Sequence, residues 1–578
     1  MKNNTIDPIT AVEQPLPTID ETGKRGIVFS DILFWFLAIF LLFVYLGARG
    51  LWGSEDRWAE VVREMRLTGD YFHPYINGKP YFDKPLLSYW FIALVTAVTG
   101  RLDEWAVRLP SAIAGLLGLW ATINLGRRLW SRQRARTAGW ILLTTYGFIL
   151  WSRTGEADME NMTAIILAVA WYWARREKPV FLSYFVFYAI CFIGAQAKGM
   201  AAIAVPILVV LPDLMSEKRW KSYLSISHFL ALITGLSLYF GPLVYSEVTK
   251  SGYQSSGLGL AFRENIIRYF RPFDHKEPFY VYFHYLPQLF FPWIPLLVAA
   301  IWAAFAHFKK LDWPSKWLTI SATLIFLFFT LSGSRRSYYI LPMLPLCALM
   351  ASLYFDWEKE EKCHRQVLGI QTVLLGIVLA VEILSPAIWP VVKARTGFEA
   401  PKELIFATVF LGLIALAPLI LQRIRPGLLS RLTGSEKKLA PLIVMSVIIM
   451  GGYLNWQEMI VDQYRSTKPF SMELKAEIAK FKSYDVGLFP EFSRGVSEML
   501  FYLDLPEPIL VISSNEELND FLNSEAKAKV LISHGDYKKE LLAALPEWMP
   551  EQPTLKEKIY PWEKEKKYQA WIIQNERK

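Results

Sequence analysis

The sequence predicts an α-helical membrane protein with about thirteen membrane-spanning helices and a small α/β domain at its C-terminal end. Three features support this fold class. The chain of 578 residues is 53% hydrophobic, with a mean hydropathy of +0.25. Many of its apolar runs approach the length of about 20 residues that crosses a bilayer. The segment after residue 458 differs from the rest, because charged residues recur along all of it and its apolar segments are short.

The first apolar run, over residues 32–51, is predicted to be a retained signal anchor, because residues 1–30 lack a short cleavable signal pattern. Residues 1–30 are then a cytoplasmic tail, and residues 31–458 form the membrane domain. The predicted spans centre on residues 32–51, 108–126, 138–152, 161–174, 180–197, 200–215, 224–245, 286–306, 317–332, 338–355, 367–390, 402–421 and 439–457.

The apolar run at residues 86–99 is predicted to be an interfacial or re-entrant helix instead of a further span. It is short for a crossing. As a crossing, it would also place the loop with five arginines between residues 127 and 136 outside, against the positive-inside rule. With this run at the interface, the basic loops fall inside, which explains the net charge of +9 without a nucleic-acid partner. The outside then receives residues 52–100, 155–160, 198–199, 247–285 and 332–337 and the chain after residue 458.

Residues 52–100 form the first outer loop, which carries charge between two apolar runs. Its first helix is predicted to be amphipathic and to lie in the membrane interface, since apolar residues recur at helical spacing with charged residues on the other side. The apolar side carries Trp58, Val61, Val62 and Met65. Glu55 and Asp56 stand at the start of this helix. Capping and the helix dipole explain such a pair without any chemistry, and a site at the membrane surface is the functional alternative.

Residues 459–578 are predicted to form a small α/β domain outside the membrane. Short apolar segments suggest buried strands, and helical patterns separate them. The strand patterns lie at residues 486–489, 509–512 and 530–532, and the helical patterns lie around residues 497–503, 516–522 and 537–545. Because the sequence of this region has no Gly-rich phosphate loop and no metal-spaced His/Cys cluster, we expect a structural or acceptor-guiding role.

The predicted outer face combines carboxylates, cations and tyrosines in a pattern that suits a reaction on a lipid phosphate. Lys and Arg can hold phosphate oxygens, while a carboxylate takes up a proton. A phosphate leaving group has a low pKa and needs no general acid. The candidate residues are Glu55, Asp56, Asp83, Lys84, Asp158, His275, Arg335, Arg336, Tyr338 and Tyr339.

The motifs around these residues resemble the C-type glycosyltransferases that use polyprenyl-phosphate sugars, and within them the protein mannosyltransferase and aminoarabinose transferase group. The resemblance covers most of the membrane part. The matching stretches are SEDRWAE at 54–60, REM at 63–65, GDY at 69–71, NGKPYFDKPL at 77–86, RLPSA at 108–112, DM at 158–159, HKEPFY at 275–280 and YILP at 339–342.

The resemblance implies an inverting enzyme of the bacterial inner membrane that works on the periplasmic face. Such an enzyme takes a sugar, aminoarabinose or a mannose-type sugar, from a polyprenyl carrier such as undecaprenyl phosphate. The implied acceptors are lipid A, another envelope lipid or glycan, or a protein. Membrane lipids surround the enzyme, and no cofactor is expected except a possible divalent metal, either zinc or magnesium or manganese.

The resemblance also implies residue roles. The first-loop Asp of the family acts on the acceptor, but with Ala59 and Glu60 aligned to the family's Ala-Glu, Ser54 stands at that position. The acids fall at Glu55 and Asp56, so both are named as the base. The further assignments are Asp158 as the second-loop acid, Lys84 as a donor-phosphate contact, Arg335, Arg336, Tyr338 and Tyr339 in the segment that closes on the carrier head group, and Asp83 and His275 as possible metal ligands.

Two other functions fit parts of the sequence. A transporter or lipid flippase usually carries ionisable groups and broken helices near the middle of the membrane, whereas the polar residues here gather in loops on one predicted face. A scaffold that acts only through its tail would lose function when residues after 458 are deleted, and loop mutations would not affect it.

Overall fold

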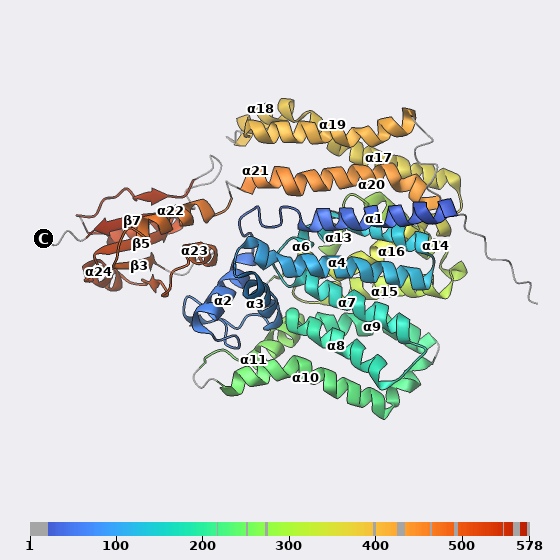
Figure 1. Cartoon of the computed structure of the whole chain (residues 1–578), viewed down its shortest axis with the longest axis horizontal. Helices are drawn as coiled ribbons and strands as arrows, with labels where there is room; N and C mark the ends of the chain where they lie inside the picture. The colour runs from blue at the N-terminus through green and yellow to red at the C-terminus, as the bar shows by residue number, and fades with distance from the viewer. Residues whose placement is uncertain are drawn as a thin grey trace, which may run out of the picture.

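The computed structural model of the chain is a bundle of roughly parallel helices with a small sheet-containing domain at one end (Figure 1). It describes residues 21–216, 218–249, 253–271, 275–396, 400–424, 434–462, 465–490, 495–546, 548–558 and 567–574. Most of the predicted cytoplasmic tail, residues 1–20, lies outside these ranges. Helix α1 (Glu21–Phe43) begins at the end of the bundle opposite the C-terminal domain (Figure 1).

Seven helices among the described residues are long and apolar enough to cross a membrane. They are α4 (Glu104–Leu129), α10 (Ile226–Thr249), α15 (Trp313–Leu331), η4 (Ser337–Met343) with α16 (Leu344–Trp357), α17 (Glu361–Ile383), α19 (Lys402–Ile424), and α20 (Gly434–Gly452) continued through η6 (Tyr453–Gln457) into α21 (Glu458–Asp462). The last of these runs four residues past the predicted domain boundary at residue 458 and ends at Asp462.

Further helices occupy the other predicted spans. They are α5 (Arg132–Leu143), α6 (Tyr146–Ser152), α7 (Asp158–Arg175), α8 (Phe181–Ala197), α9 (Ala201–Ser216), and the pair α13 (Tyr282–Leu289) and α14 (Ile294–Ala306), which is bent by 120°. Counting that pair as one span gives eight by length and composition in the described chain. The total of thirteen stays a prediction.

Short helices fill the connections. They are η1 (Arg219–Leu224), α11 (Gly257–Phe262), η2 (Arg263–Ile267), α12 (Arg268–Phe270), η3 (Phe308–Lys310) and α18 (Ser385–Thr396).

Several of the long helices expose large apolar side chains. Ile233 of α10 is 64% exposed, Val373 of α17 is 63% exposed and Phe406 of α19 is 63% exposed. In contrast, η4 and α16 are buried along most of their length. Apolar surface of this extent is stable only against lipid or another protein. Together with the length of these helices, it makes the chain a polytopic membrane protein.

The first outer loop carries the two predicted short helices, α2 (Glu55–Thr68) and α3 (Leu87–Thr99), with the hairpin β1 (Tyr75–Ile76) and β2 (Lys79–Pro80) between them. Both helices lie at the end of the bundle that faces the C-terminal domain (Figure 1). The 13 residues of α3 span about 20 Å at 1.5 Å per residue. That is well short of the hydrocarbon thickness of about 30 Å, so α3 is not a full crossing.

Helix α2 differs from its prediction on one point. The apolar side is buried as expected, but the charged side is buried too, because it packs against α23 of the C-terminal domain. Arg63 pairs with Glu60 at 2.7 Å and donates a hydrogen bond of 2.7 Å to the carbonyl of Leu505. The helix was predicted to lie in the membrane interface, but in the structure a second protein layer covers its charged side.

The C-terminal domain is a five-stranded mixed sheet with helices. Its strands are β3 (Tyr484–Phe489), β4 (Leu510–Val511), β5 (Ala528–His534), β6 (Leu555–Lys556) and β7 (Tyr568–Gln574), in the order β4-β3-β5-β7-β6. Its helices are α22 (Lys468–Ile478), α23 (Val496–Leu503), α24 (Asn515–Asn523), η7 (Gly535–Tyr537) and α25 (Lys538–Ala544). Strand β3 is parallel to β4 and β5, and β7 is antiparallel to β5 and β6. The three predicted strands are present, and β6 and β7 were not predicted.

Buried hydrogen bonds join this domain to the first outer loop. Asn77 donates to the carbonyl of Ile509 at 2.9 Å and accepts from the N–H of the same residue at 2.8 Å. The backbone N–H of Leu51 donates to the Tyr502 hydroxyl at 2.9 Å, and that hydroxyl lies 2.9 Å from Glu104 at the start of α4. The C-terminal domain therefore fixes the position of the loop that carries Glu55, Asp56, Asp83 and Lys84 of the predicted site.

Candidate functional site

Glu55 is held by a fully buried ion pair. Its two carboxylate oxygens accept from Nε and Nη2 of Arg108, both at 2.7 Å, and also from the backbone N–H groups of Gly155 at 2.6 Å and Trp52 at 2.8 Å. Burial alone would raise the pKa of Glu55, but Arg108 and Arg49 lower it to about 2. Glu55 is thus a permanently ionised anchor between α2, α4 and the loop before α7, and these contacts do not favour it as a base.

Asp56 lies at the contact between α2 and α23. Its Oδ1 accepts from the backbone N–H of Arg57 at 2.8 Å, and the backbone of Glu498 in α23 also donates to it. Burial raises the pKa of Asp56 to about 6, the positive charge of Arg57 opposes this rise, and the negative charge of Glu55 adds to it. The side chain is therefore directed to the C-terminal domain.

Arg57 links the start of α2 to the loop before α3. Its Nη2 donates to Oγ of Ser54 at 2.6 Å, and its Nη1 donates to the Tyr81 hydroxyl at 3.0 Å. That hydroxyl donates to Oδ2 of Asp83 at 3.3 Å, and the same oxygen pairs with Nζ of Lys84 at 2.6 Å. Burial would raise the pKa of Asp83, but the charges of Lys84 and Arg57 lower it. The predicted pair of residues 83 and 84 is therefore part of a polar network that begins at Ser54.

Lys198 brings the second outer loop into this network. It stands at the end of α8, forms an ion pair with Asp158 at the start of α7, and lies 4.7 Å from the centroid of the Tyr338 ring. Burial lowers the pKa of Lys84, Asp83 opposes this, and the charge of Lys198 lowers it further. The charges of the two ammonium groups therefore act on each other. The sequence placed Lys198 on the outer face but assigned it no role.

Glu156 approaches the start of α2 from the loop before α7. Its Oε1 accepts from the backbone N–H of Ser54 at 3.2 Å. Burial raises the pKa of Glu156 to about 7, the charge of Asp158 raises it further, and Lys198 opposes the shift. Like Lys198, it lay on the predicted outer face without an assigned role.

Arg335 and Arg336 have different surroundings. Arg335 donates from Nη1 to the carbonyl of Glu277 at 2.6 Å, and from Nε and Nη2 to the carbonyl of Thr330 at 3.1 and 3.0 Å. The donors of its guanidinium are therefore engaged by two backbone carbonyls. Arg336 has a buried Nε with no hydrogen-bond partner among the described residues. Of these two arginines, Arg336 is therefore the one whose buried N–H group could donate to a phosphate.

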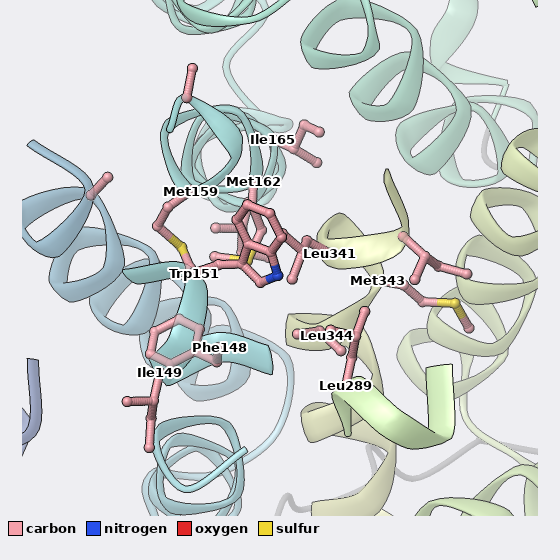
Figure 2. Close-up of a cluster of buried hydrophobic side chains, with 14 of the residues drawn as sticks. Phe148, Ile149, Trp151, Met159, Met162, Ile165, Leu289, Leu341, Met343 and Leu344 are labelled. Atoms are coloured by element: carbon pink, nitrogen blue, oxygen red, sulfur yellow. The ribbon is translucent and has the colours of Figure 1, made fainter. Parts of the chain in front are cut away.

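A hydrophobic cluster beneath the site fixes the elements that carry it (Figure 2). The Trp151 ring of α6 packs against Tyr338 of η4 with ring centroids 4.8 Å apart, and Tyr338 packs edge-on against Tyr339 at 5.2 Å. The cluster includes Phe148, Ile149, Trp151, Met159, Met162, Ile165, Leu289, Leu341, Met343 and Leu344. Because Met159 directly follows Asp158, this packing fixes Asp158 relative to the tyrosines.

The two possible metal ligands do not form a metal site with other residues. No group of three or more His, Cys, Asp and Glu side chains that could hold a metal occurs in the described ranges. Asp83 is engaged by the cations of Lys84 and Arg57. His275 has a backbone φ of +54° and accepts hydrogen bonds at its carbonyl from the N–H groups of Glu277 and Arg335. These contacts fit a charge-paired carboxylate better than a metal ligand, and the metal stays a prediction.

Comparisons with known proteins find relatives and a shared fold. The family model described as dolichyl-phosphate-mannose-protein mannosyltransferase matches residues 83–245. An undecaprenyl phosphate-alpha-4-amino-4-deoxy-L-arabinose arabinosyl transferase of Aeromonas salmonicida is 30% identical over 374 residues, which are 61% of this chain and 66% of that protein. The protein of the same name from Pseudomonas aeruginosa strain LESB58 is 29% identical over 386 residues, which are 65% of this chain and 68% of that protein. The chain thus matches about two thirds of the length of these relatives.

Two solved structures have the same fold as this chain. The crystal structure of ArnT from Cupriavidus metallidurans bound to undecaprenyl phosphate superposes with a TM-score of 0.71 at 18% identity, covering 94% of this chain and 98% of that chain. The apo structure of the same protein gives a TM-score of 0.68 at 19% identity, covering 95% and 98%. The likeness extends over both the helical bundle and the C-terminal domain.

Proposed function

We propose that this chain, which belongs to the C-type glycosyltransferases that use polyprenyl-phosphate sugars, transfers a single sugar from a polyprenyl phosphate carrier to an acceptor at one face of the membrane. The relatives are named for 4-amino-4-deoxy-L-arabinose on undecaprenyl phosphate, which favours an aminoarabinose-type sugar over a mannose-type sugar. By the same argument, lipid A or a related envelope glycolipid is the favoured acceptor, and another glycan or a protein is the alternative.

The observation that carries this proposal is the group of cations beside carboxylates at one end of the bundle. Lys84 and Lys198 are each paired with one carboxylate, and their charges act on each other; Arg336 keeps a buried donor without a partner among the described residues. A sugar-linked lipid phosphate is a diester, and it gains about one negative charge when the sugar leaves. Cations fixed around it stabilise that charge more in the transition state than in the ground state.

The reaction follows from this arrangement. An acceptor oxygen attacks the anomeric carbon while the bond between that carbon and the phosphate oxygen breaks. The bonding electron pair goes to the phosphate, and the proton of the acceptor goes to a carboxylate. Direct displacement inverts the anomeric centre. Asp158 pairs with Lys198 and Asp83 pairs with Lys84, and these pairings favour a role for both acids in placing the lysines.

We further propose that the chain crosses the bacterial inner membrane thirteen times, with the site and the C-terminal domain on the periplasmic face. The arginine-rich connection between α4 and α5 follows one crossing after the first outer loop, so it lies at the other end of the bundle. Basic connections favour the cytoplasmic side. The charged groups of the site lie at one end of the bundle and not at its middle, which favours a transferase over a transporter or flippase.

Sugar transfer by the purified protein tests the proposal. The protein in lipid nanodiscs is given undecaprenyl-phosphate-linked aminoarabinose and lipid A, and the products are followed by mass spectrometry. We expect Lys84→Ala to lower kcat/KM about 10²- to 10³-fold, the loss typical when one charge-stabilising donor is removed. Lys79→Ala, which removes an exposed lysine of the same loop, is the matched control and should retain activity.

The alternatives give different results in parallel measurements. Mass spectrometry of envelope glycolipids and glycoproteins, from cells with and without the protein, identifies the acceptor. Movement of the carrier lipid across a liposome membrane by the wild-type protein, without any sugar transfer, contradicts the proposed function and supports a flippase.

A further inference from the structure

The site lacks a carboxylate at the position where the family carries its first-loop Asp. Ser54 stands there, and its Oγ accepts a hydrogen bond from Arg57 at 2.6 Å. A serine hydroxyl beside a guanidinium is not a base at neutral pH. The next acid in the chain, Glu55, is fully used by Arg108 and two backbone donors. Asp56 accepts from the backbone of α23. The proton acceptor must therefore come from another segment.

Glu156 places a carboxylate directly at the backbone of Ser54. Its Oε1 is 3.2 Å from the Ser54 nitrogen, and a methyl group added at Gly53 would lie 3.6 Å from the same oxygen. The backbone of Glu156 is fixed on both sides, because its N–H donates to the Thr154 carbonyl at 2.8 Å and its carbonyl accepts from the Ser111 hydroxyl at 2.9 Å. Its other oxygen, Oε2, has no hydrogen-bond partner in the part of the chain that the structure describes.

The charges around Glu156 suit a group that exchanges a proton. Asp158 and Glu55 repel its negative charge, and Lys198 attracts it. The negative charge of Glu156 also acts on the Tyr338 hydroxyl. Burial and Asp158 together raise the pKa of Glu156 to about 7. A general base works best when its pKa lies near the working pH. Burial also raises the pKa of Asp158, but the Lys198 ammonium, which is bound directly to it, opposes this rise and occupies its carboxylate.

We propose that Glu156 is the general base of this enzyme and takes the place of the family's first-loop Asp, with Oε2 receiving the acceptor's proton. This inference rests on the proposed function. In the step, the acceptor O–H bond breaks and its proton passes to Oε2. The acceptor oxygen bonds to the anomeric carbon, and the bond from that carbon to the phosphate oxygen breaks with its electron pair on the phosphate. The Ser54 N–H holds Oε1, so Oε2 has a fixed direction.

Removal of the base should lower turnover without weakening donor binding. We expect Glu156→Gln to lower kcat about 10²- to 10⁴-fold, the range typical of one general base, with little change in KM for the lipid-linked sugar. The matched control is Glu160→Gln. Glu160 lies one helical turn further on and accepts from the Ser111 hydroxyl at 3.1 Å, a bond that glutamine keeps, so this variant should stay active.

The pH profile and a rescue separate a base from a structural residue. In the wild-type enzyme, kcat/KM should rise with pH through about 7, since Glu156 must lose its proton to act, and this limb should vanish in Glu156→Gln. Adding Ser54→Asp to Glu156→Gln restores the family's carboxylate position and should return at least about a tenth of the activity, within the scale of one general base.

Sugar transfer by the wild-type enzyme tests the proposed function, and the Glu156 variants test the identity of the base. If the wild-type enzyme transfers sugar and Glu156→Gln retains activity within a few fold, Glu156 is not the base. A loss in Glu156→Gln that comes with a lower melting temperature, and that Ser54→Asp does not rescue, also overturns the proposal.

Discussion

Arg335 and Arg336 are neighbours in the chain, but their guanidinium groups have different surroundings. In the structure, Arg335 donates to two backbone carbonyls, those of Glu277 and Thr330. It therefore ties the segment before η4 to the end of α15. Arg336 has a buried donor atom without a partner among the described residues. A buried unpaired donor costs about 1–3 kcal/mol, a cost that an anionic ligand would remove.

This contrast predicts opposite effects for the two alanine variants. Arg336→Ala should weaken use of the lipid-phosphate donor about 10- to 100-fold, equivalent to a charged hydrogen bond of about 1.5–3 kcal/mol, and leave the melting temperature unchanged. Arg335→Ala should lower the melting temperature, because two carbonyls lose their donors. Donor titrations and thermal melts of both proteins in detergent measure this. Equal donor affinities in the two variants would contradict the assignment.

The sequence was informative about the site as a region and less so about single residues. It placed the first and second outer loops on the same side, and the hydrogen bond from the Ser54 N–H to Glu156 joins them in the structure; that this side is the outside stays a prediction from the Lys and Arg content of the loops. It could not choose between Glu55 and Asp56, because that choice depends on Arg108, which is 53 residues away in the chain. Lys198 was missed because one lysine between two apolar runs has the pattern of an ordinary interfacial residue.

At the scale of elements, α2 shows what periodicity cannot predict. An apolar stripe with a charged opposite side fits a helix at a membrane surface, and it fits equally well a helix between two protein layers. The sequence patterns predicted the strands β3, β4 and β5 and the helix α23, but they did not predict that α23 packs on α2. The order of layers depends on tertiary contacts between residues more than 400 positions apart.

The contact between α2 and α23 is predicted to weaken as the pH rises. Burial raises the pKa of Glu498 to about 8, and the charge of Asp56 adds to it. Burial likewise raises the pKa of Asp56 to about 6. An acid whose folded pKa is raised contributes stability that is present at low pH and lost as the pH rises through that pKa. Melting temperatures should therefore fall from about pH 4, near the ordinary pKa values of these carboxyls, to about pH 8, the folded pKa of Glu498.

Removing the Glu498 charge tests the source of this effect. Glu498→Gln should flatten part of the decline, because the amide has no proton to lose. Other buried acids whose pKa values burial raises, among them Asp56, Glu60 and Glu156, contribute to the remainder. Glu516→Gln, at an exposed position of α24, is the matched control and should leave the decline unchanged. Identical profiles for Glu498→Gln and the wild-type protein would show that this carboxyl does not titrate on unfolding.

For the whole molecule, the proposed topology gives a direct labelling prediction. In a Cys363→Ser background, Lys359→Cys and Lys527→Cys each add one exposed thiol, the first between α16 and α17 and the second before β5. A membrane-impermeant maleimide applied to cells with a permeable outer membrane should label Lys527→Cys. Lys359→Cys should react only after lysis. The reverse pattern would place the site on the cytoplasmic face.

The contacts between the first outer loop and the C-terminal domain also determine when the loop can finish folding during synthesis. Leu51 and Tyr502 are 451 residues apart in the chain, and Arg63 and Leu505 are 442 residues apart. Until α23 and the segment after it leave the ribosome and reach the outer face, Leu51 and Arg63 lack these two partners. The first outer loop is therefore synthesised early, but its contacts form only when nearly the whole chain has been made. A chain that is interrupted before α23 should be inactive.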